Sequence, residues 1–595
     1  MVAAADIRPT LDEARSRLRD LFGFADFRGV QADVVARVLA GQSTLAVMPT
    51  GAGKSLTYQL PATMLAGTCV VISPLIALMH DQLRAARANG IRAATLTSAD
   101  SDRDATIAAF RAGTLDLLYV APERASQQHF RELLGSAPLA LFAIDEAHCV
   151  SEWGHDFRPD YRLLRPLMDA FPLVPRLALT ATADAHTRAD ILAQLGIAPD
   201  GMIIAGFDRP NISYAIRPRD GGLRQLTSLM AAAPGPGIIY APTRRKVDEL
   251  AERLGAVTGR DVRPYHAGLD PALRAGNQAA FVASEDMVMV ATVAFGMGID
   301  KPDVRFVAHA GIPKSIESYY QETGRAGRDG DPAQAVLFWS AEDFVRARQR
   351  LADVDDGRIA AERARLDALA GLVETGGCRR AVLLRHFGEV PPAECGNCDN
   401  CLEKPAVRDA TDLARKLLSA VYRTGQSFGF GYLQNVLTGV ADDRVRQRGH
   451  DALGVFGIVD AAEAPLLRPL SRALQARGTL VATEHGGLAL GGNARAVLKG
   501  EDAVEIVIPP AGRKRRSQAA NPVGDPLFDA LRELRRQLAQ EGGVPPYVIF
   551  HDATLRDIAA ARPGSRAELA RVPGVGAKKL DAYGGALLAA VREHG

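Results

Sequence analysis

The stretch that decides the fold is Leu139-Ala-Leu-Phe-Ala-Ile-Asp-Glu-Ala-His148, followed at once by Cys-Val-Ser-Glu-Trp-Gly-His-Asp-Phe-Arg at residues 149–158. Residues 139–144 are apolar throughout, which is typical of a strand buried in a parallel sheet. Asp145 and Glu146 follow at the carboxyl end of this strand. Two acids at such a place can hold Mg²⁺ and orient a water molecule for attack on a phosphate. The stretch therefore predicts nucleotide hydrolysis beside a parallel sheet.

The loop behind the two acids combines aromatic rings with a cation. It contains Trp153, His155, Phe157 and Arg158. Aromatic rings next to an arginine are equipped to stack on unpaired bases. One segment thus joins the predicted hydrolysis to the binding of a single nucleic-acid strand. The alternative is an ordinary strand end with a polar turn.

A glycine-rich turn earlier in the chain supplies the expected phosphate-binding partner. Residues 43–48 are typical of a strand, and Pro-Thr-Gly-Ala-Gly-Lys-Ser follows at 49–55. Gly51 and Gly53 let backbone N–H groups turn toward a phosphate, and the N-terminus of a following helix adds a positive dipole. We expect Lys54 to reach the β- and γ-phosphates of ATP and Ser55 to ligate Mg²⁺. Met48 stands where the strict pattern has its first glycine, and a glycine-rich turn without a ligand is the alternative.

With these motifs, the chain resembles the RecQ-type DNA helicases of superfamily 2, in their bacterial form, over nearly all of its 595 residues. Residues 22–31 are similar to the family's adenine-recognition segment. The resemblance implies that Gln31 reads the adenine edge and that Phe24 and Arg28 enclose the ring. Residues 71–82, 119–124 and 179–182 are similar to the family's strand-gripping and coupling motifs.

A second set of motifs follows at residues 237–243, 291–300 and 321–330, and the resemblance places Asp300 among the nucleotide-binding residues. Short apolar runs at 237–240, 288–292 and 306–309 alternate with helical patterns, which predicts a second parallel sheet. Arg325 and Arg328 are three residues apart, so on a helix they share a face. From a second domain, that face can offer a guanidinium to the γ-phosphate. The alternative is a solvated arginine pair on a surface helix.

Length and composition bound the interpretation. A chain of 595 residues corresponds to about four domains at ~150 residues each, and 47% hydrophobic and 24% charged residues are ordinary values for globular protein. The net charge is only +2, so nucleic-acid binding must depend on local clusters. The clearest one, residues 513–516, either contacts DNA or stays solvated in a linker. The chain has no run of 18 apolar residues, and its first residues do not predict a signal peptide, so we expect a cytoplasmic protein without a membrane span.

Four of the six cysteines form a metal-ligand pattern. Cys378, Cys395, Cys398 and Cys401 have the spacing C-x₁₆-C-x₂-C-x₂-C, with a helix expected to begin at the first of them. Four thiolates suit tetrahedral Zn²⁺ in a closed structural site, and the pattern matches the RecQ zinc subdomain. An iron–sulfur cluster and four unrelated reduced thiols are the alternatives. Cys69 and Cys149 are expected to serve packing only.

The last third of the chain predicts two small domains. Helical periodicity over residues 409–500, followed by a hairpin signal at 478–490 with Gly-Gly at its turn, predicts a winged helix that resembles the RecQ C-terminal domain. The alternative is that this winged helix contacts other proteins only. Residues 525–595 resemble an HRDC domain. There Tyr547 offers a ring for stacking on a base, and Lys578 and Lys579 follow a Gly-Val-Gly turn. These residues predict contact with DNA. The alternative is that they serve packing alone.

The predicted fold is α/β, with two RecA-like parallel-sheet domains, a zinc-binding helical subdomain, a winged helix and a small helical HRDC domain. The expected boundaries are 1–206 and 207–345 for the two RecA-like domains, 346–408 for the zinc subdomain, 409–508 for the winged helix, 509–524 for a basic linker and 525–595 for the HRDC domain.

The predicted function is ATP-dependent unwinding of duplex and branched DNA. We expect Lys54, Asp145, Glu146, Arg325 and Arg328 to carry the catalysis. We expect Ser55 and Asp145 to hold Mg²⁺, and Trp153, Phe157 and Arg158 to contact single-stranded DNA. The resemblance alone implies 3′→5′ polarity and roles in recombination and repair. The alternatives are a duplex translocase that separates no strands, which a strand-displacement assay distinguishes, and a DNA-binding scaffold without catalysis, which a phosphate-release assay distinguishes.

Overall fold

The structure is a computed structural model that describes residues 8–74, 76–97, 100, 102–151, 158–296, 301–351, 356–483, 487–508 and 525–594. The first domain is built on a seven-stranded parallel sheet with the strand order β3-β4-β2-β5-β6-β1-β7. Its strands are β1 (Thr44–Val47), β2 (Thr68–Ile72), β3 (Ala93–Leu96), β4 (Leu117–Val120), β5 (Leu139–Ile144), β6 (Arg176–Thr180) and β7 (Met202–Ile204). β5 coincides with the predicted apolar strand. β1, β2 and β4 are buried at every residue, as expected for a parallel sheet covered on both faces.

Helices and two 3₁₀ turns connect these strands. They are α1 (Leu11–Phe22), α2 (Gln31–Leu39), α3 (Leu56–Ala62), α4 (Ile76–Ala88), α5 (Arg103–Arg111), α6 (Pro122–Ala125), α7 (Gln128–Leu134), η1 (Ala147–Val150), α8 (Pro159–Arg162), α9 (Leu164–Asp169), α10 (Ala185–Leu195) and η2 (Pro199–Gly201). α1 begins with a capping box in which Thr10 and Glu13 each bond the other's backbone N–H. Because all strands run parallel, the loops after β1, β5 and β6 meet at one edge of the sheet.

The second domain contains the second predicted sheet, with six parallel strands in the order β10-β11-β9-β12-β13-β8. The strands are β8 (Ile212–Pro218), β9 (Gly237–Tyr240), β10 (Val262–Tyr265), β11 (Val288–Ala291), β12 (Phe306–His309) and β13 (Ala333–Trp339). The helices are α11 (Gly222–Ala232), α12 (Arg244–Thr258), α13 (Pro271–Ala283), α14 (Ile316–Thr323) and α15 (Ala341–Arg350). The strands predicted at 237–240 and 306–309 are confirmed, and the one predicted at 288–292 ends one residue earlier.

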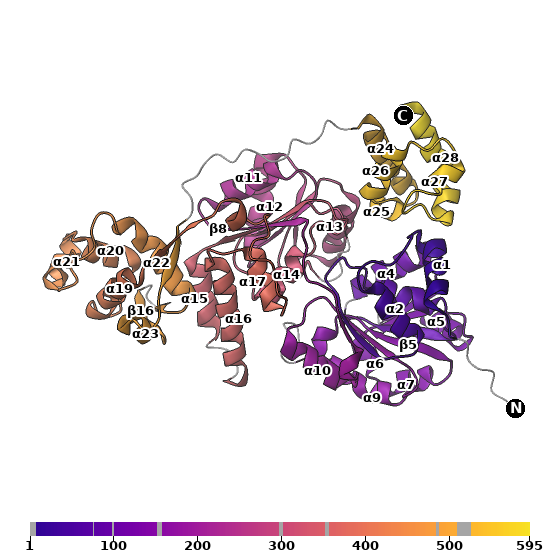
Figure 1. Cartoon of the computed structure of the whole chain (residues 1–595), viewed down its shortest axis with the longest axis horizontal. Helices are drawn as coiled ribbons and strands as arrows, with labels where there is room; N and C mark the ends of the chain where they lie inside the picture. The colour runs from indigo at the N-terminus through magenta and orange to yellow at the C-terminus, as the bar shows by residue number, and fades with distance from the viewer. Residues whose placement is uncertain are drawn as a thin grey trace.

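The zinc subdomain packs beside the second domain and contacts α10 of the first, and the winged helix follows on the side away from the first domain (Figure 1). The zinc subdomain consists of α16 (Asp356–Glu374), α17 (Arg379–His386) and α18 (Asp399–Leu402). The winged helix contains β14 (Ala406–Asp409), α19 (Thr411–Arg423), α20 (Phe430–Thr438), α21 (Asp443–Gln447), η4 (His450–Ala452), η5 (Ala464–Leu466), α22 (Leu467–Ala476), β15 (Leu480–Ala482), β16 (Leu488–Leu490), α23 (Ala494–Lys499) and β17 (Glu505–Ile508). β15 and β16 form the predicted antiparallel hairpin. β14 pairs with β17, so the boundary expected between residues 408 and 409 falls inside a strand of the winged helix.

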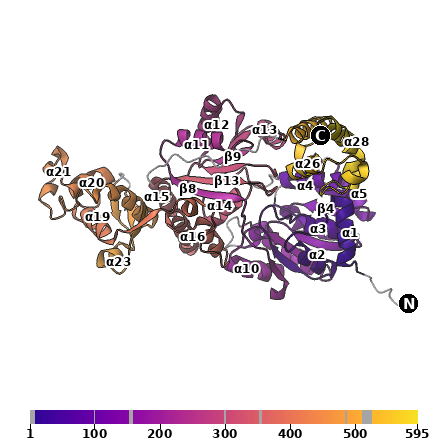
Figure 2. The same ribbon diagram turned by 45° about the horizontal axis from the view of Figure 1, so that its top comes forward.

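The C-terminal helical domain lies at the opposite end of the molecule from the winged helix. Its helices are α24 (Pro526–Glu541), α25 (Pro546–Ile549), α26 (Asp552–Ala561), α27 (Arg566–Leu569) and α28 (Ala577–His594). Figure 2 shows this domain beside the first domain and close to α13 of the second. The basic linker at 509–524 lies outside the described residues. No helix within the described ranges is both long enough and apolar enough to cross a bilayer.

Candidate functional site

The phosphate loop lies between β1 and α3, where two glycines make its turn possible. Gly51 and Gly53 have φ values of +87° and +75°, which side chains rarely tolerate. A Cβ at Gly53 would also lie 2.4 Å from Gln31 Nε2. Lys54 Nζ donates to the carbonyl oxygen of Met48 at 3.2 Å, which holds the ammonium at the mouth of the loop.

The predicted adenine-recognition residues line the same cavity as the phosphate loop. Gln31 is 4% exposed. It accepts from the Arg28 N–H at 2.9 Å and donates to the Ala52 carbonyl oxygen at 2.8 Å. The Arg28 guanidinium lies over the Phe24 ring at 5.8 Å. Gln31 therefore ties the base-recognition segment to the phosphate loop, in addition to its expected contact with adenine.

The two acids after β5 differ in backbone and surroundings. Asp145 is buried. Burial raises its pKa, the charge of Glu146 adds to the rise, and the Lys54 ammonium opposes it. Glu146 has a φ of +47°, in the left-handed region, and its carboxylate lies 3.4 Å from His148 Nδ1. Ser55 and Asp145 supply a hydroxyl and a carboxylate oxygen, the donor class that Mg²⁺ prefers.

His148 connects the acids to the next strand. Its Nδ1 lies 3.0 Å from the Thr180 hydroxyl at the end of β6, and its side chain is fully buried. The Thr180 hydroxyl in turn donates to the Thr182 carbonyl oxygen at 3.2 Å. The predicted coupling motif at 179–182 therefore contacts the acid-bearing turn through this histidine.

Arg325 and Arg328 enter the cavity from the second domain. Arg325 is 6% exposed, and a Cβ at Gly51 would lie 3.2 Å from Arg328 Cγ. The expectation that both arginines share a helix face is wrong, because α14 ends at Thr323 and both residues follow it in a turn. The glycines at 324 and 327 that flank the turn explain why the helix stops there.

Together these residues form one cavity of 580 Å³ between the two sheets. It is lined by Phe24, Arg28, Gln31, Gly51, Gly53, Lys54, Ser55, Asp145 and Glu146 from the first domain and by Arg325 and Arg328 from the second. Asp300, the remaining residue expected at the nucleotide, lies outside the described residues.

The four clustered cysteines meet as the spacing predicts. The four Sγ atoms lie within 4.8 Å of one another, with Cys395 and Cys401 4.0 Å apart and Cys398 and Cys378 3.9 Å apart. Four thiolate sulfurs that each lie ~2.3 Å from one zinc ion would be about 3.8 Å from one another. The four cysteines therefore fit a single tetrahedral ion. An iron–sulfur cluster would hold the sulfurs farther apart because it stands between them. Cys378 is the N-cap of α17, as predicted.

Family models match this chain in the same order as the domains described above. The chain matches family models described as DEAD/DEAH box helicase at 28–191, helicase conserved C-terminal domain at 222–330, RecQ zinc-binding at 341–402, RQC domain at 404–515 and HRDC domain at 525–591. It is 41% identical to an ATP-dependent DNA helicase RecQ of Haemophilus influenzae, over 98% of this chain and 96% of that protein. The chain belongs to the RecQ family of ATP-dependent DNA helicases.

A further relative agrees with this assignment. An ATP-dependent DNA helicase RecQ of Bacillus subtilis is 37% identical over 96% of this chain and 97% of its own length. A solved structure of the Mycobacterium smegmatis helicase Lhr, bound to single-stranded DNA and AMP-PNP, covers 91% of this chain and 73% of that chain at 18% identity, with a TM-score of 0.45. As a RecQ-family helicase the enzyme hydrolyses ATP and acts on DNA, and its four-cysteine centre is a zinc site.

The residues predicted to contact single-stranded DNA are described only in part. Trp153 and Phe157 lie outside the described residues. Arg158 donates through Nη1 to the carbonyl oxygen of Pro74 at 3.0 Å. Pro74 belongs to the segment 71–82 that resembles a strand-gripping motif, so Arg158 connects the aromatic loop to that segment of this RecQ-family motor.

The HRDC residues predicted to bind DNA lie near or in the contact with the motor domains. Tyr547 shares a small cavity with Glu285 and Lys301 of the second domain. Lys578 donates to the carbonyl oxygen of Ala88 in the first domain at 2.9 Å. Lys579 is half-buried, with its ammonium 5.4 Å from the centre of the Phe550 ring. In this arrangement the second domain covers Tyr547 in part, whereas Lys578 stays exposed with its ammonium bonded to the first domain.

An ionic contact holds the HRDC domain on the second RecA-like domain. Arg532, Arg535 and Arg536 of α24 donate to the Glu285 carboxylate at 2.9, 2.5 and 3.0 Å. Glu285 follows α13, and its side chain is 9% exposed. His551 of the same domain lines the nucleotide cavity. The sequence contains no motif that predicts this contact, because the residues are about 250 positions apart.

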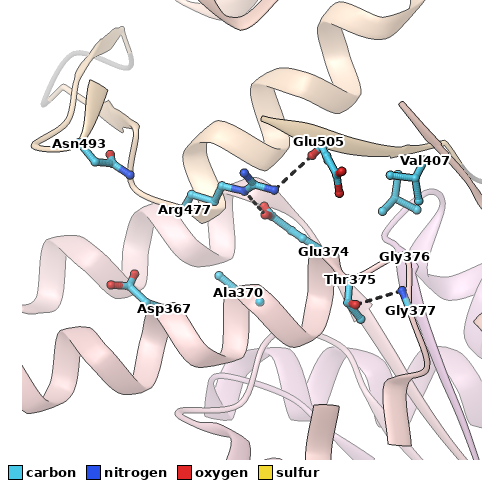
Figure 3. Close-up of a pocket in the computed structure, with 12 residues that line it drawn as sticks. Asp367, Ala370, Glu374, Thr375, Gly376, Gly377, Val407, Arg477, Asn493 and Glu505 are labelled. Carbon is cyan, nitrogen blue, oxygen red and sulfur yellow. Dashed lines mark hydrogen bonds and ion pairs between the residues drawn. The ribbon is translucent and has the colours of Figure 1, made fainter. Parts of the chain in front are cut away.

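The winged helix contacts the zinc subdomain through an ion pair whose carboxylate is buried. Figure 3 shows Arg477, directly after α22, reaching both Glu374 at the end of α16 and the backbone of Glu505 in β17. Arg477 Nε donates to the Glu374 carboxylate at 2.9 Å, and Nη2 donates to the Glu505 carbonyl oxygen at 3.2 Å. Burial raises the pKa of Glu374 to about 7, although the charge of Arg477 opposes the rise. A cavity of 600 Å³ lies alongside this junction.

Proposed function

We propose that this RecQ-family helicase unwinds duplex and branched DNA with 3′→5′ polarity, in recombination and repair, by cycles of closure of its two RecA-like domains on ATP. The observation that supports the proposal best is the cavity in which residues from both domains face each other. Because Lys54 and Glu146 come from one domain and Arg325 and Arg328 from the other, hydrolysis requires the domains to approach. Movement of the domains is then linked to each ATP consumed.

Within this cavity we assign each group by its chemistry. Lys54 holds the β- and γ-phosphates, and Glu146 accepts a proton from the attacking water. Ser55 and Asp145 would hold Mg²⁺, which neutralises charge on the phosphates when it is bound. Arg325 and Arg328 stabilise the charge that develops on the transferred phosphoryl group, an effect worth about 10³–10⁵ in rate in related systems.

The loop at 152–158 would transmit strand binding to this chemistry. Trp153 and Phe157 stack on bases in this proposal, and Arg158 tethers the loop to Pro74. Replacing both aromatic residues by alanine should leave basal ATPase nearly unchanged and weaken its stimulation by single-stranded DNA. Equal stimulation in variant and parent would contradict this role of the loop.

The proposal is tested by strand displacement on duplexes with a 3′ tail, a 5′ tail or a fork, with ATP hydrolysis followed in the same samples. Unwinding of the 3′-tailed and forked duplexes, and none with Lys54→Ala, is expected. ATP hydrolysis without strand separation would favour a duplex translocase. Absence of hydrolysis in the parent protein would favour a scaffold.

A further inference from the structure

Arg209 lies in the segment that joins the two RecA-like domains, between β7 and β8, and it makes four hydrogen bonds to backbone carbonyl oxygens. Nη1 donates to Thr50 at 2.8 Å and to Gly324 at 3.1 Å. Nη2 donates to Ala326 at 2.9 Å and to Gly327 at 2.9 Å. The two terminal nitrogens of a guanidinium carry four N–H groups, and here all four have an acceptor.

These acceptors belong to the two loops that meet at the phosphate end of the cavity. Thr50 is part of the phosphate loop of the first domain, whereas residues 324–327 form the turn that carries Arg325 and precedes Arg328. The loops also touch directly, since a Cβ at Gly324 would lie 3.5 Å from Thr50 Cβ. One side chain in the interdomain segment therefore contacts both halves of the proposed catalytic site.

Asn211, two residues further on, extends the same contact. Its Nδ2 donates to the carbonyl oxygens of Gly327 and Asp331, each at 2.8 Å. Gly327 has a φ of +55°, and a Cβ at this position would lie 2.5 Å from Asn211 Nδ2. The arginine-bearing turn is thus held from the interdomain segment at several successive carbonyl groups.

We propose that Arg209 is a positioning residue for ATP hydrolysis: when the two domains are closed on each other, it fixes the turn that carries Arg325 and Arg328 at a set distance from the phosphate loop. The inference rests on the roles proposed above for these two arginines. It requires the planar fork of a guanidinium, because a lysine ammonium presents three donors at a single point and cannot span four carbonyl groups.

The test compares Arg209→Ala, Arg209→Lys and Arg328→Ala in the full chain, by steady-state ATPase with saturating single-stranded DNA. A displacement of about 1 Å at a catalytic group can cost about 10²-fold in rate. We therefore expect both Arg209 variants to lose about 10²-fold in kcat, with KM for ATP changed by less than about threefold. Affinity for ADP–aluminium fluoride, which mimics the transferring phosphoryl group, should fall much more than affinity for ADP.

Arg219→Ala serves as the matched control. Arg219 donates to the Ala310 carbonyl oxygen at 2.8 Å and to the Ser340 hydroxyl and Asp343 carboxylate. These partners all lie within the second domain. Arg219→Ala should lower Tm. It should leave kcat, and the ratio of the affinities for ADP–aluminium fluoride and ADP, close to the parent values. A merely structural role for Arg209 would give the same result as this control.

The outcomes separate the inference from the proposed function. Parent-like kcat in Arg209→Ala, with Arg328→Ala inactive, overturns the positioning role and leaves the proposed function intact. Parent-like kcat in Arg328→Ala overturns the role proposed for that arginine, on which the inference rests, whereas failure of the parent protein to separate strands overturns the proposed function itself. If Arg209→Ala does not fold, Arg209→Lys decides: full activity with lysine would show that a positive charge is sufficient and would refute the role of the fork.

Discussion

Glu146 shows at the scale of one residue how the fold prepares the proposed reaction. Its positive φ of +47° is unusual for a residue with a side chain. Such conformations persist where the surroundings enforce them, and they cluster at functional sites. Here the chain turns directly after the buried strand β5, which directs neighbouring acids to different partners: Asp145 to Ser73 at 3.5 Å and Glu146 to His148.

Glu146→Gln should lower the DNA-stimulated ATPase rate by about 10²-fold or more, because an amide cannot accept the proton of the attacking water. The variant should still bind ATP and DNA, since its shape is preserved. Phosphate release and a binding titration with a fluorescent ATP analogue check the two expectations. Turnover near the parent rate would remove Glu146 from the proposed chemistry.

The cysteines allow a second prediction for single residues. Cys398→Ser should reduce bound zinc below one ion per chain and destabilise the protein, because binding of a structural zinc by four thiolates contributes directly to folding, by ~10–16 kcal/mol in small peptides. Elemental analysis and thermal unfolding provide the measurements, with Cys69→Ser as the comparison outside the cluster. Iron without zinc, accompanied by visible absorption, would contradict the zinc assignment.

At the scale of elements, the sequence predicts much of the architecture because strands and motifs carry local signals. The apolar run 139–144, the strands at 237–240 and 306–309 and the helix after Cys378 all agree with the structure. The arginine-bearing turn differs, because the glycines around it outweigh a helical pattern. His148, Arg209 and the Glu285 contact were not predicted as site residues, because their partners are distant in sequence and no spacing reveals them.

The junction between α16 and the winged helix yields a prediction about pH. Because burial raises the pKa of Glu374 from 4.5 to about 7, the folded protein holds a proton there that the unfolded chain releases. This group therefore costs stability as pH rises from about 4.5 to about 7, by at most roughly 3 kcal/mol. Glu374→Gln has no carboxyl group to titrate and so lacks this cost. The Tm of the variant minus the Tm of the parent should therefore increase from pH 5 to pH 7.5.

Asp367→Asn is the control for this experiment, since Asp367 lies on the same helix, is about half exposed and pairs with Arg348. Its Tm difference from the parent should vary much less over the same pH range. A Glu374→Gln difference that is constant with pH would show that this carboxyl titrates normally in the folded protein.

At the scale of the whole molecule, the HRDC domain contacts both RecA-like domains. The contact with the second domain is the cluster of three arginines on Glu285. The contact with the first includes a hydrogen bond from the Gly574 N–H to the Gly23 carbonyl oxygen at 3.2 Å. Because Gly23 follows α1 and lies in the base-recognition segment, the HRDC domain lies against both sides of the nucleotide cavity.

Glu285→Ala should release the HRDC domain, because it removes the carboxylate that the buried Arg535 shares with the partly exposed Arg532 and Arg536. We expect a larger radius of gyration and faster hydrogen exchange in α13 and α24. We also expect tighter binding of single-stranded DNA, as Tyr547 is uncovered and the Lys578 ammonium is released from Ala88. Glu252→Ala, at an exposed position of α12, is the control. Unchanged scattering and exchange in Glu285→Ala would show that apolar contacts, and not this carboxylate, hold the domain.

The docked HRDC domain also has a consequence for measurements of DNA affinity. The HRDC domain and its docking surface belong to one polypeptide, so dilution of the protein does not separate them. The docking surface therefore competes with DNA for the HRDC domain at a fixed effective concentration, which is on the order of millimolar for short flexible tethers. DNA added from solution must exceed this competition before it can reach the face that the sequence predicts to bind it, around Tyr547 and Lys578. Added salt weakens the charge pairs at the docking surface as well as contacts with phosphates. The affinity of the C-terminal domain for DNA should therefore fall less steeply with salt when the domain is part of the intact chain than when it is isolated.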